Sequence, residues 1–380
     1  MGEIPLGMPS VRLLLFDVST FSIVVFFLFF YPRERKYLKD FPFLKQFLLF
    51  FAIACFSLAV NCFRLTLPET LISSLYLIRL GIYLSFTAVC FSLCKAKIIP
   101  VHILKVYLLG LGSAVAILGI VQLFLYPSLR NLYYLGWDEH LNRAFGSFFD
   151  PGYFGFLLSI HSLVGVDLIM KAKKRIIQYI YIGMTGICFL GVILSHARSA
   201  YLAFIVGFIV LFGLRKGVKF LLISLIFIAV VIALFSLSPQ EGIRLNRITS
   251  SWARIESWQH ALTIFKDHPL FGVGYNSYRY AQRDYGFLDN GWETSHAGAG
   301  SDSSFLLVAA TMGIVGIGSF LYLWGSILLR SYREKHWLIL SAVTAVLVNS
   351  FFINSLFYSW VLFILGFILA FSFCDVNRKE

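Results

Sequence analysis

The sequence predicts an all-α protein that crosses a membrane about 11 times (10–12) and carries one long external loop containing helices. Hydrophobic residues make up 59% of the 380 residues and charged residues only 13%. A soluble domain could not bury that much apolar surface. Apolar stretches of about 20 residues also recur along the chain, and this is the length of a helix that spans the bilayer.

Basic residues between the apolar stretches orient the predicted spans. Short segments such as "CKAK" and "KAKKR" are rich in lysine, which is typical of the cytoplasmic side. Alternation then places residues 126–151 and 238–302 outside and the C-terminus in the cytoplasm. We divide the single membrane domain into an N-terminal bundle (1–237), the external loop (238–302) and C-terminal helices (303–380). The predicted spans are 11–31, 42–62, 71–94, 101–125, 152–170, 176–195, 199–214, 218–237, 303–326, 337–354 and 355–373.

The kind of basic residue differs between the two predicted sides. Lys266 is the only lysine of the predicted external segments, whereas arginines recur there. A guanidinium is always protonated, and its planar fork holds phosphate through two hydrogen bonds. An arginine-rich external face therefore suggests an anionic ligand such as phosphate or pyrophosphate. The alternative for each arginine is an ion pair with an external acid or a lipid headgroup. The external arginines are Arg12, Arg64, Arg130, Arg143, Arg198, Arg244, Arg247, Arg254, Arg279 and Arg283.

Arg198 lies in "SHARSAYLAF", where the sixth predicted span ends and the seventh begins. It could be an interfacial arginine that reaches toward water. The turn is too short for a solvated loop, and the small residues around Arg198 permit close helix packing. His196 is adjacent. These features favour a functional arginine facing a cavity.

The loop 126–151 ends in "NRAFGSFFDPGYFGF". Its Asp150-Pro151-Gly152 sequence predicts a turn followed by a helix start. A structural turn explains the glycine and the proline, but it does not explain Arg143.

The long external loop contains "SSWARIESWQHALTIFKDHP", which predicts an amphipathic helix with Arg254 on an early turn. Ser250 or Ser251 is the expected N-cap. The glycine-punctuated turn "LFGVGYNSY" follows and contains Tyr275. The expected apolar stripe of the helix is formed by Trp258, Ala261, Leu262 and Phe265.

The segment "ETSHAGAGSDSS" leads from the loop into the ninth predicted span and carries His296 and Asp302. A flexible backbone with a histidine and an aspartate suits a substrate gate, and it suits a plain linker equally well. Within the membrane, Arg79 is expected to pair with an acid such as Asp17 or to open onto the cavity. Asp167, near the basic "KAKKR" end, is expected to form a structural salt bridge. The six cysteines lie in or beside predicted spans and support neither a disulfide framework nor a metal site.

Four stretches, in this order, resemble the O-antigen polymerase and O-antigen ligase superfamily, which are bacterial membrane glycosyltransferases with a GT-C-like helical architecture. They are "RAFGSFFDPGYFG", "SHARSAYLAF", "RIESWQHALTIFKDHPLFGVGYNSY" and "DSSFLLVAATMGIVG", and they fall within residues 143–316. The resemblance implies an undecaprenyl-pyrophosphate-linked glycan donor in the lipid bilayer and inverting transfer to an acceptor hydroxyl. It places the reaction on the periplasmic face of the bacterial inner membrane, without a cofactor, a metal or a nucleic acid.

The resemblance also implies roles for individual residues. Arg198 and Arg254 match the family's "RSA" and "R-x-x-x-W" arginines, which hold the pyrophosphate, with Arg143 in support. His196, Arg247 and Tyr275 are candidates for further support. Such fixed guanidinium groups stabilise the charge that develops on the leaving group. Asp302 or His296 can take the proton of the acceptor hydroxyl.

Asp302 also separates two branches of the superfamily. Ligases resemble one another in a histidine at the start of their "H-N-x-x-L…G-x-x-G" segment, and counting back from Gly313 and Gly316 puts Asp302 there. This departure favours a polymerase of oligosaccharide repeat units, an interpretation that allows a chain-length regulator as partner. His296 is close enough to substitute, so a ligase that transfers the glycan to lipid A core remains the alternative. A lipid-glycan flippase or another transporter is less favoured, because transporters commonly contain internal repeats and none is visible.

Overall fold

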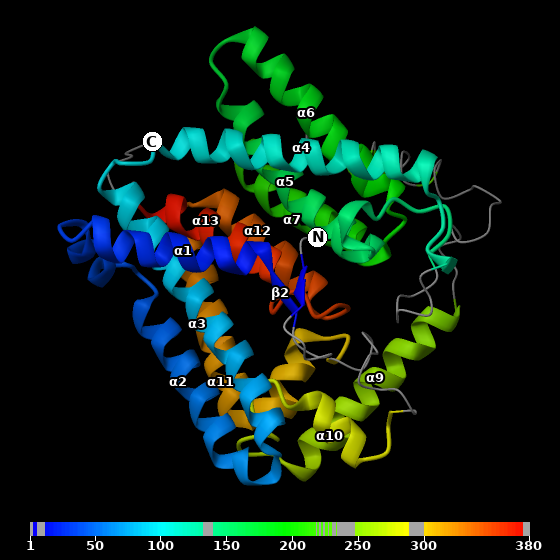
Figure 1. Ribbon diagram of the computed structural model, residues 1–380. Coiled ribbons are helices and arrows are strands. Elements are labelled where there is room, and N and C mark those ends of the chain that lie inside the picture. The colour runs from blue at the N-terminus through cyan, green and yellow to red at the C-terminus, as the bar shows by residue number, and fades with distance from the viewer. Residues whose placement is uncertain are drawn as a thin grey trace. The chain divides into compact units, whose positions relative to one another are not determined.

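The structure, a computed structural model, describes residues 3–5, 12–131, 140–217, 248–288 and 300–374, with a few positions between 219 and 233. Helices dominate the described residues (Figure 1), so the predicted all-helical class is confirmed.

One short antiparallel strand pair, β1 (Glu3–Pro5) and β2 (Arg12–Leu14), precedes the first helix. The first span, predicted to begin at residue 11, begins instead as a helix at Leu15. A short apolar run such as "VRLLL" suits a strand as well as a helix, which explains the difference.

The chain forms two compact units, each discontinuous in sequence. The first comprises Met1–Ile99, Thr249–Arg330 and Ser350–Glu380. In it, α3 packs against α1, α2 and α13. Its helices are α1 (Leu15–Phe30), η1 (Glu34–Asp40), α2 (Leu44–Asn61), η2 (Cys62–Arg64), α3 (Leu67–Lys95), α9 (Ile248–Asp267), α10 (Tyr278–Asp284), most of α11 (Ser304–Arg333) and α13 (Ser359–Phe373). The described part of the predicted external loop therefore contains the helices α9 and α10.

The second unit comprises Pro100–Ile248 and Ser331–Asn349. At its centre, α5 packs against α4, α6 and α7, and α12 packs against α7 and α5. Its helices are α4 (Val101–Leu125), η4 (Gly146–Phe148), α5 (Pro151–Lys171), α6 (Arg175–Leu194), α7 (Arg198–Lys216) and α12 (Trp337–Asn349).

Local sequence signals explain where two of the central helices begin. At α3, Thr66 and Glu69 form a capping box in which the Thr66 backbone N–H donates to Glu69 Oε2 at 2.9 Å. At α5, Asp150 Oδ1 accepts hydrogen bonds from the backbone N–H groups of Gly152 (2.5 Å) and Tyr153 (3.1 Å). The helix start predicted from Asp150-Pro151-Gly152 is therefore confirmed.

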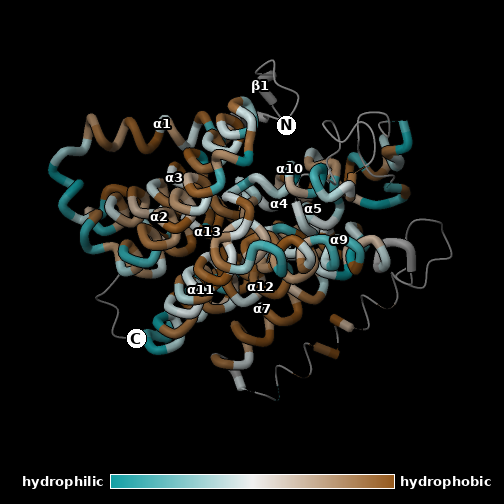
Figure 2. The backbone as a smooth tube through the Cα atoms, turned by 90° about the horizontal axis from the view of Figure 1, so that it is seen from below, coloured by the Kyte–Doolittle hydropathy of each residue, from teal (hydrophilic) through white to brown (hydrophobic). Residues whose placement is uncertain are grey.

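Within the described residues, six helices are long and apolar enough to cross a membrane. They are α2 with η2, α3, α4, α5, α6 and α11. A seventh candidate joins α1 to η1 across a bend of 118°, and α7, α12 and α13 are shorter apolar helices. Figure 2 shows apolar residues along most of these helices. The chain is therefore a multi-pass membrane protein. The predicted span 218–237 lies mostly outside the described residues, and the total of about 11 crossings stays a prediction.

The charges inside the predicted spans are paired as expected. Arg79 Nη2 lies 2.9 Å from Asp17 Oδ2, which joins α3 to α1. Asp167 of α5 lies 2.8 Å from Lys105 Nζ and 3.5 Å from Lys171 Nζ. Pairing is the usual fate of ionised groups at membrane depth, because an isolated charge there is costly.

Candidate active site

Arg143 is a buried arginine held against the turn between α6 and α7. Its Nε donates a hydrogen bond to the backbone oxygen of Ser195 at 2.9 Å, and its Nη2 donates to that of His196 at 3.2 Å. Arg198 lies two residues after His196. The structure therefore brings together three residues that the sequence analysis selects: Arg143, His196 and Arg198.

Close packing fixes the shape of this turn. The Ala144 N–H donates to the Leu194 oxygen at 2.9 Å, which aligns the segment before α5 with the end of α6. His196 has a φ of +47°, a left-handed conformation that is uncommon outside glycine. On α5, a Cβ added to Gly155 would lie 2.2 Å from Ser195 Oγ. Glycine at 155 therefore permits the close helix packing expected at this junction.

Arg198 is half-buried and is the first residue of α7. The first backbone N–H groups of a helix have no partner within it, and they carry a partial positive charge. A guanidinium at this position adds to that charge instead of balancing it. The combination favours an anion at the start of α7.

The helix α9, which carries Arg254, begins earlier than predicted. It starts at Ile248, so the expected N-cap residues Ser250 and Ser251 lie within its first turn. No glycine or proline separates Ile248 from Ser250, and the helix therefore continues one turn toward the N-terminus.

The buried face of α9 also differs slightly from the predicted stripe. Ala261 and Ile264 are fully buried, whereas Leu262 is 42% exposed. Residues three apart share a helix face, so the stripe passes through Ala261 and Ile264 and leaves Leu262 outside. Arg254 is half-buried, and the described residues provide it with no hydrogen bond or ion pair.

Asp302 is half-buried where α9 meets the start of α11. Its backbone N–H donates to Ser257 Oγ at 3.0 Å. Ser257 lies three residues after Arg254, one turn along the same face of α9, so Arg254 and Asp302 lie near the same stretch of this helix. The helix cap is Ser303, whose Oγ accepts from the Leu306 N–H at 3.5 Å.

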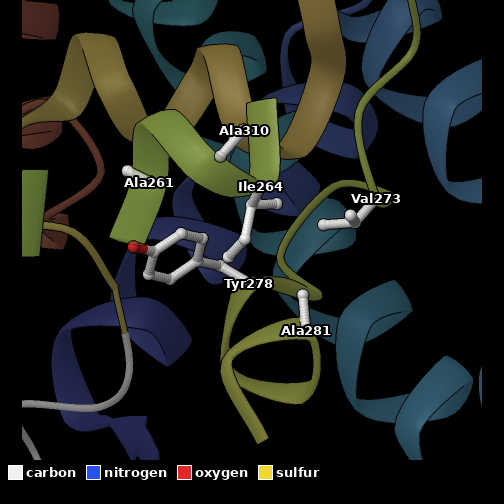
Figure 3. Packing of buried hydrophobic residues seen from close by; sticks show 6 residues of the cluster. All are labelled: Ala261, Ile264, Val273, Tyr278, Ala281 and Ala310. Atoms are coloured by element: carbon white, nitrogen blue, oxygen red, sulfur yellow. The ribbon is translucent and has the colours of Figure 1, made fainter. Parts of the chain in front are cut away.

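Tyr278 lies near Asp302 and was not selected from the sequence. Its ring packs with the buried cluster that Figure 3 shows. Burial raises the pKa of its phenol, the Ser301 hydroxyl acts in the opposite direction, and the Asp302 charge raises the pKa further. The phenol therefore stays neutral and can donate a hydrogen bond. The sequence signal was weak, because "YNSYRY" contains three tyrosines.

Tyr275, which the sequence analysis does select, lies beside Arg79. It is buried, and its ring packs edge-on against Phe357 at 6.2 Å between centroids. Burial raises the pKa of its phenol, while the positive charge of Arg79 acts in the opposite direction. Tyr275 therefore lies near Arg79, the α3 partner of the ion pair with α1.

Other selected residues fall outside the region just described. His296 and Arg247 lie outside the residues that the structure describes. Arg143, His196 and Arg198 belong to the second unit, whereas Arg254, Tyr275 and Asp302 belong to the first. In the described ranges, no three His, Cys, Asp or Glu side chains gather in a group that could hold a metal ion.

These observations define a multi-pass helical membrane protein with half-buried arginines and an aspartate beside one of the arginine-bearing helices. Residues 183–321 match a family model described as O-antigen ligase. The match confirms the resemblance to the O-antigen polymerase and ligase superfamily. It also supports the glycosyltransferase class predicted for this chain. The matched stretch includes Arg198, Arg254 and Asp302, and Arg143 precedes it. A comparison with curated proteins finds no match for the chain.

Proposed function

We propose that the protein polymerises undecaprenyl-pyrophosphate-linked oligosaccharide repeat units into O-antigen or a related surface polysaccharide. The reaction takes place on the periplasmic face of the bacterial inner membrane and needs no metal. The observation that supports this most is the hydrogen bond between Asp302 and Ser257. This bond, made by the Asp302 backbone N–H, brings residue 302 to the helix that carries Arg254. It supports assigning the acceptor-side base and the donor-side cation to one region.

The proposed step is a displacement at the anomeric carbon of the donor sugar. The acceptor hydroxyl oxygen forms the new glycosidic bond, and the bond from that carbon to the pyrophosphate oxygen breaks with its electron pair. Asp302 accepts the hydroxyl proton. The guanidinium groups of Arg254 and Arg198 stabilise the negative charge that develops on the pyrophosphate. Arg143 supports this by holding the turn before Arg198.

Tyr278 adds a neutral hydrogen-bond donor on the Asp302 side. Its pKa is raised by burial, so the phenol does not compete with the carboxylate as a base at neutral pH. In this proposal it orients either the carboxylate or the acceptor hydroxyl.

The alternative is a ligase that transfers the glycan to lipid A core. The description of the matched family favours it, and His296 would then act at the acceptor. Asp302 at the position of the ligase histidine favours the polymerase, in which a chain-length regulator is a natural partner.

An assay with purified protein and lipid-pyrophosphate repeat units tests the proposal. Elongation of the glycan on its lipid, undiminished by a chelator, is the expected result. Transfer to added lipid A core without elongation would support the ligase instead. Failure to form any glycosidic bond would reject both and favour a transport function.

A further inference from the structure

The helix α11 is interrupted in its interior at Gly313. This residue has a φ of 65° and a ψ of −162°, far from helical values. Such a break leaves carbonyls before it and N–H groups after it without their usual partners in the helix. Inside a membrane protein these groups must find other partners.

Residues 269–274, just after α9, supply those partners. Two N–H groups of this segment donate to carbonyls before the break, and two N–H groups after the break donate to carbonyls of the segment. We call residues 269–274 together with 310–315 the clasp. Its four bonds are Val273 N–H to Ala310 O (3.1 Å), Gly274 N–H to Thr311 O (2.9 Å), Ile314 N–H to Pro269 O (2.8 Å) and Val315 N–H to Leu270 O (3.4 Å).

Two glycines make this close approach possible. A Cβ added to Gly272 would lie 2.2 Å from the carbonyl carbon of Thr311, and one added to Gly313 would lie 2.3 Å from that of Leu270. Both glycines also have a φ of +65°, which side chains disfavour. Each half of the clasp therefore requires a glycine where it meets the other half.

A third element, α2, joins the clasp through Ser57. The Ser57 hydroxyl is buried and lies 2.9 Å from the Phe271 oxygen and 2.8 Å from the Thr311 oxygen. A hydroxyl has one proton, so the two carbonyls share it. Ser57 thereby holds one carbonyl from each half of the clasp.

The clasp is the second of two points that tie α9 and its extension to α11. The first point is the Ser257–Asp302 hydrogen bond, and the Pro269–Ile314 bond lies twelve residues further along both stretches. The two points come in the same order along both stretches, so these stretches run in the same direction between them. Between these points, Ala261 and Ile264 pack in one buried cluster with Ala310 (Figure 3).

We propose that Gly272, Gly313 and Ser57 are positioning residues: the clasp sets the register of α9 along α11 and so holds Arg254 beside Asp302. This inference rests on the proposed function. The "LFGVG" and "ATMGIVG" stretches are then the two halves of one structural element. A displacement of about 1 Å between reacting groups can cost about 10²-fold in rate, so a slipped register would impair turnover severely.

A cysteine pair reports the register without any need for activity. In full-length protein carrying Ser257→Cys and Asp302→Cys, oxidation should form a disulfide that mass spectrometry identifies among the native cysteines. Adding Gly272→Ala or Gly313→Ala should slow this cross-linking about tenfold, as expected for a loss of about 1.4 kcal/mol in the aligned state. Gly318→Ala is the matched control, because it lies on the same helix with nothing within 4 Å of an added Cβ.

The same variants without the cysteine pair test the consequence for turnover. Gly272→Ala and Gly313→Ala should lower kcat about 10²-fold with little change in the donor KM, and Gly318→Ala should match the parent. Ser57→Ala introduces no clash and replaces a glycine variant that does not fold. It should slow both the cross-linking and the turnover. Unchanged cross-linking in folded clasp variants would overturn the inference, and so would slowed cross-linking with an unchanged kcat. Normal cross-linking of the 257–302 cysteine pair, together with no glycosidic bond formed by the protein without that pair, would reject the proposed function instead.

Discussion

Arg143 and Arg254 are assigned to the same ligand from the sequence, yet their surroundings differ. Arg143 is buried and donates to two backbone oxygens at the α6–α7 turn. Its remaining Nη1 lies 3.4 Å from His140 Nδ1. Arg254 is half-buried on α9, and the described residues give it no hydrogen-bonding or ionic partner.

The difference teaches that a guanidinium near a site can act in two ways. When its N–H groups are engaged by backbone oxygens, the arginine holds a loop in shape, and it contributes to a ligand mainly through its charge. When the planar fork is not engaged, it can hold a pyrophosphate through two hydrogen bonds. We therefore expect activity to depend on Arg254 directly and on Arg143 through the turn that carries Arg198.

The largest effect is expected in the α9–α11 region, at Asp302. Asp302→Asn keeps the shape of the side chain and removes the proton acceptor, so the polymerisation rate should fall about 10²–10⁴-fold. Donor binding and the melting temperature should be unchanged. Ser303→Ala is the control for a capping role, and it should cost about 0.5–2 kcal/mol of stability with a much smaller effect on rate. Full polymer synthesis by Asp302→Asn would eliminate the catalytic role of this residue.

The next largest effect is expected for the two arginines with the pyrophosphate role. Arg254→Lys and Arg198→Lys keep the charge but lose the fork, and each should reduce turnover about 10²–10³-fold, the usual loss for one donor to the developing charge. Arg130→Lys, an exposed arginine in a predicted external segment, is the control and should be mild. Rates measured on equal amounts of folded protein decide this. If all three variants behave alike, the arginine fork has no special role.

At Arg143, the main effect should be on stability. Arg143→Gln removes a charged donor from two buried carbonyls, and this should lower the free energy of unfolding by about 1.5–3 kcal/mol. Turnover should fall as a consequence, because the turn before Arg198 loosens. Thermal unfolding in detergent or nanodiscs, with Arg130→Gln as an exposed control, measures the effect. A variant with parental stability and severely reduced turnover would instead make Arg143 a direct ligand.

Two kinds of structural feature can be predicted from the sequence: those set by local motifs, and those whose absence would cost much free energy. Hydropathy locates the helices, the Asp150-Pro151 pair locates the start of α5, and the cost of an isolated charge in the membrane predicts the Arg79–Asp17 pair. The backbone partners of Arg143 have no sequence signal, since every residue has a carbonyl. The clasp was missed because it joins segments about 40 residues apart through backbone atoms, and a glycine such as Gly313 marks only conformational freedom.

The smallest effect is expected at Arg283, one of the external arginines for which the sequence suggests an anionic ligand. The structure instead pairs it with Glu69 at the start of α3 and with Asp284, at 2.8 Å from the latter. Its side chain remains 33% exposed, so Arg283→Ala should cost only about 0.2–1 kcal/mol of stability and leave turnover unchanged. Glu69→Gln retains the capping box. A double-mutant cycle of Arg283→Ala with Glu69→Gln, measured by unfolding, should give a coupling energy of the same size. Turnover loss on the scale expected for Arg254 would place Arg283 among the pyrophosphate ligands, and the contrast between paired and unengaged arginines would then fail.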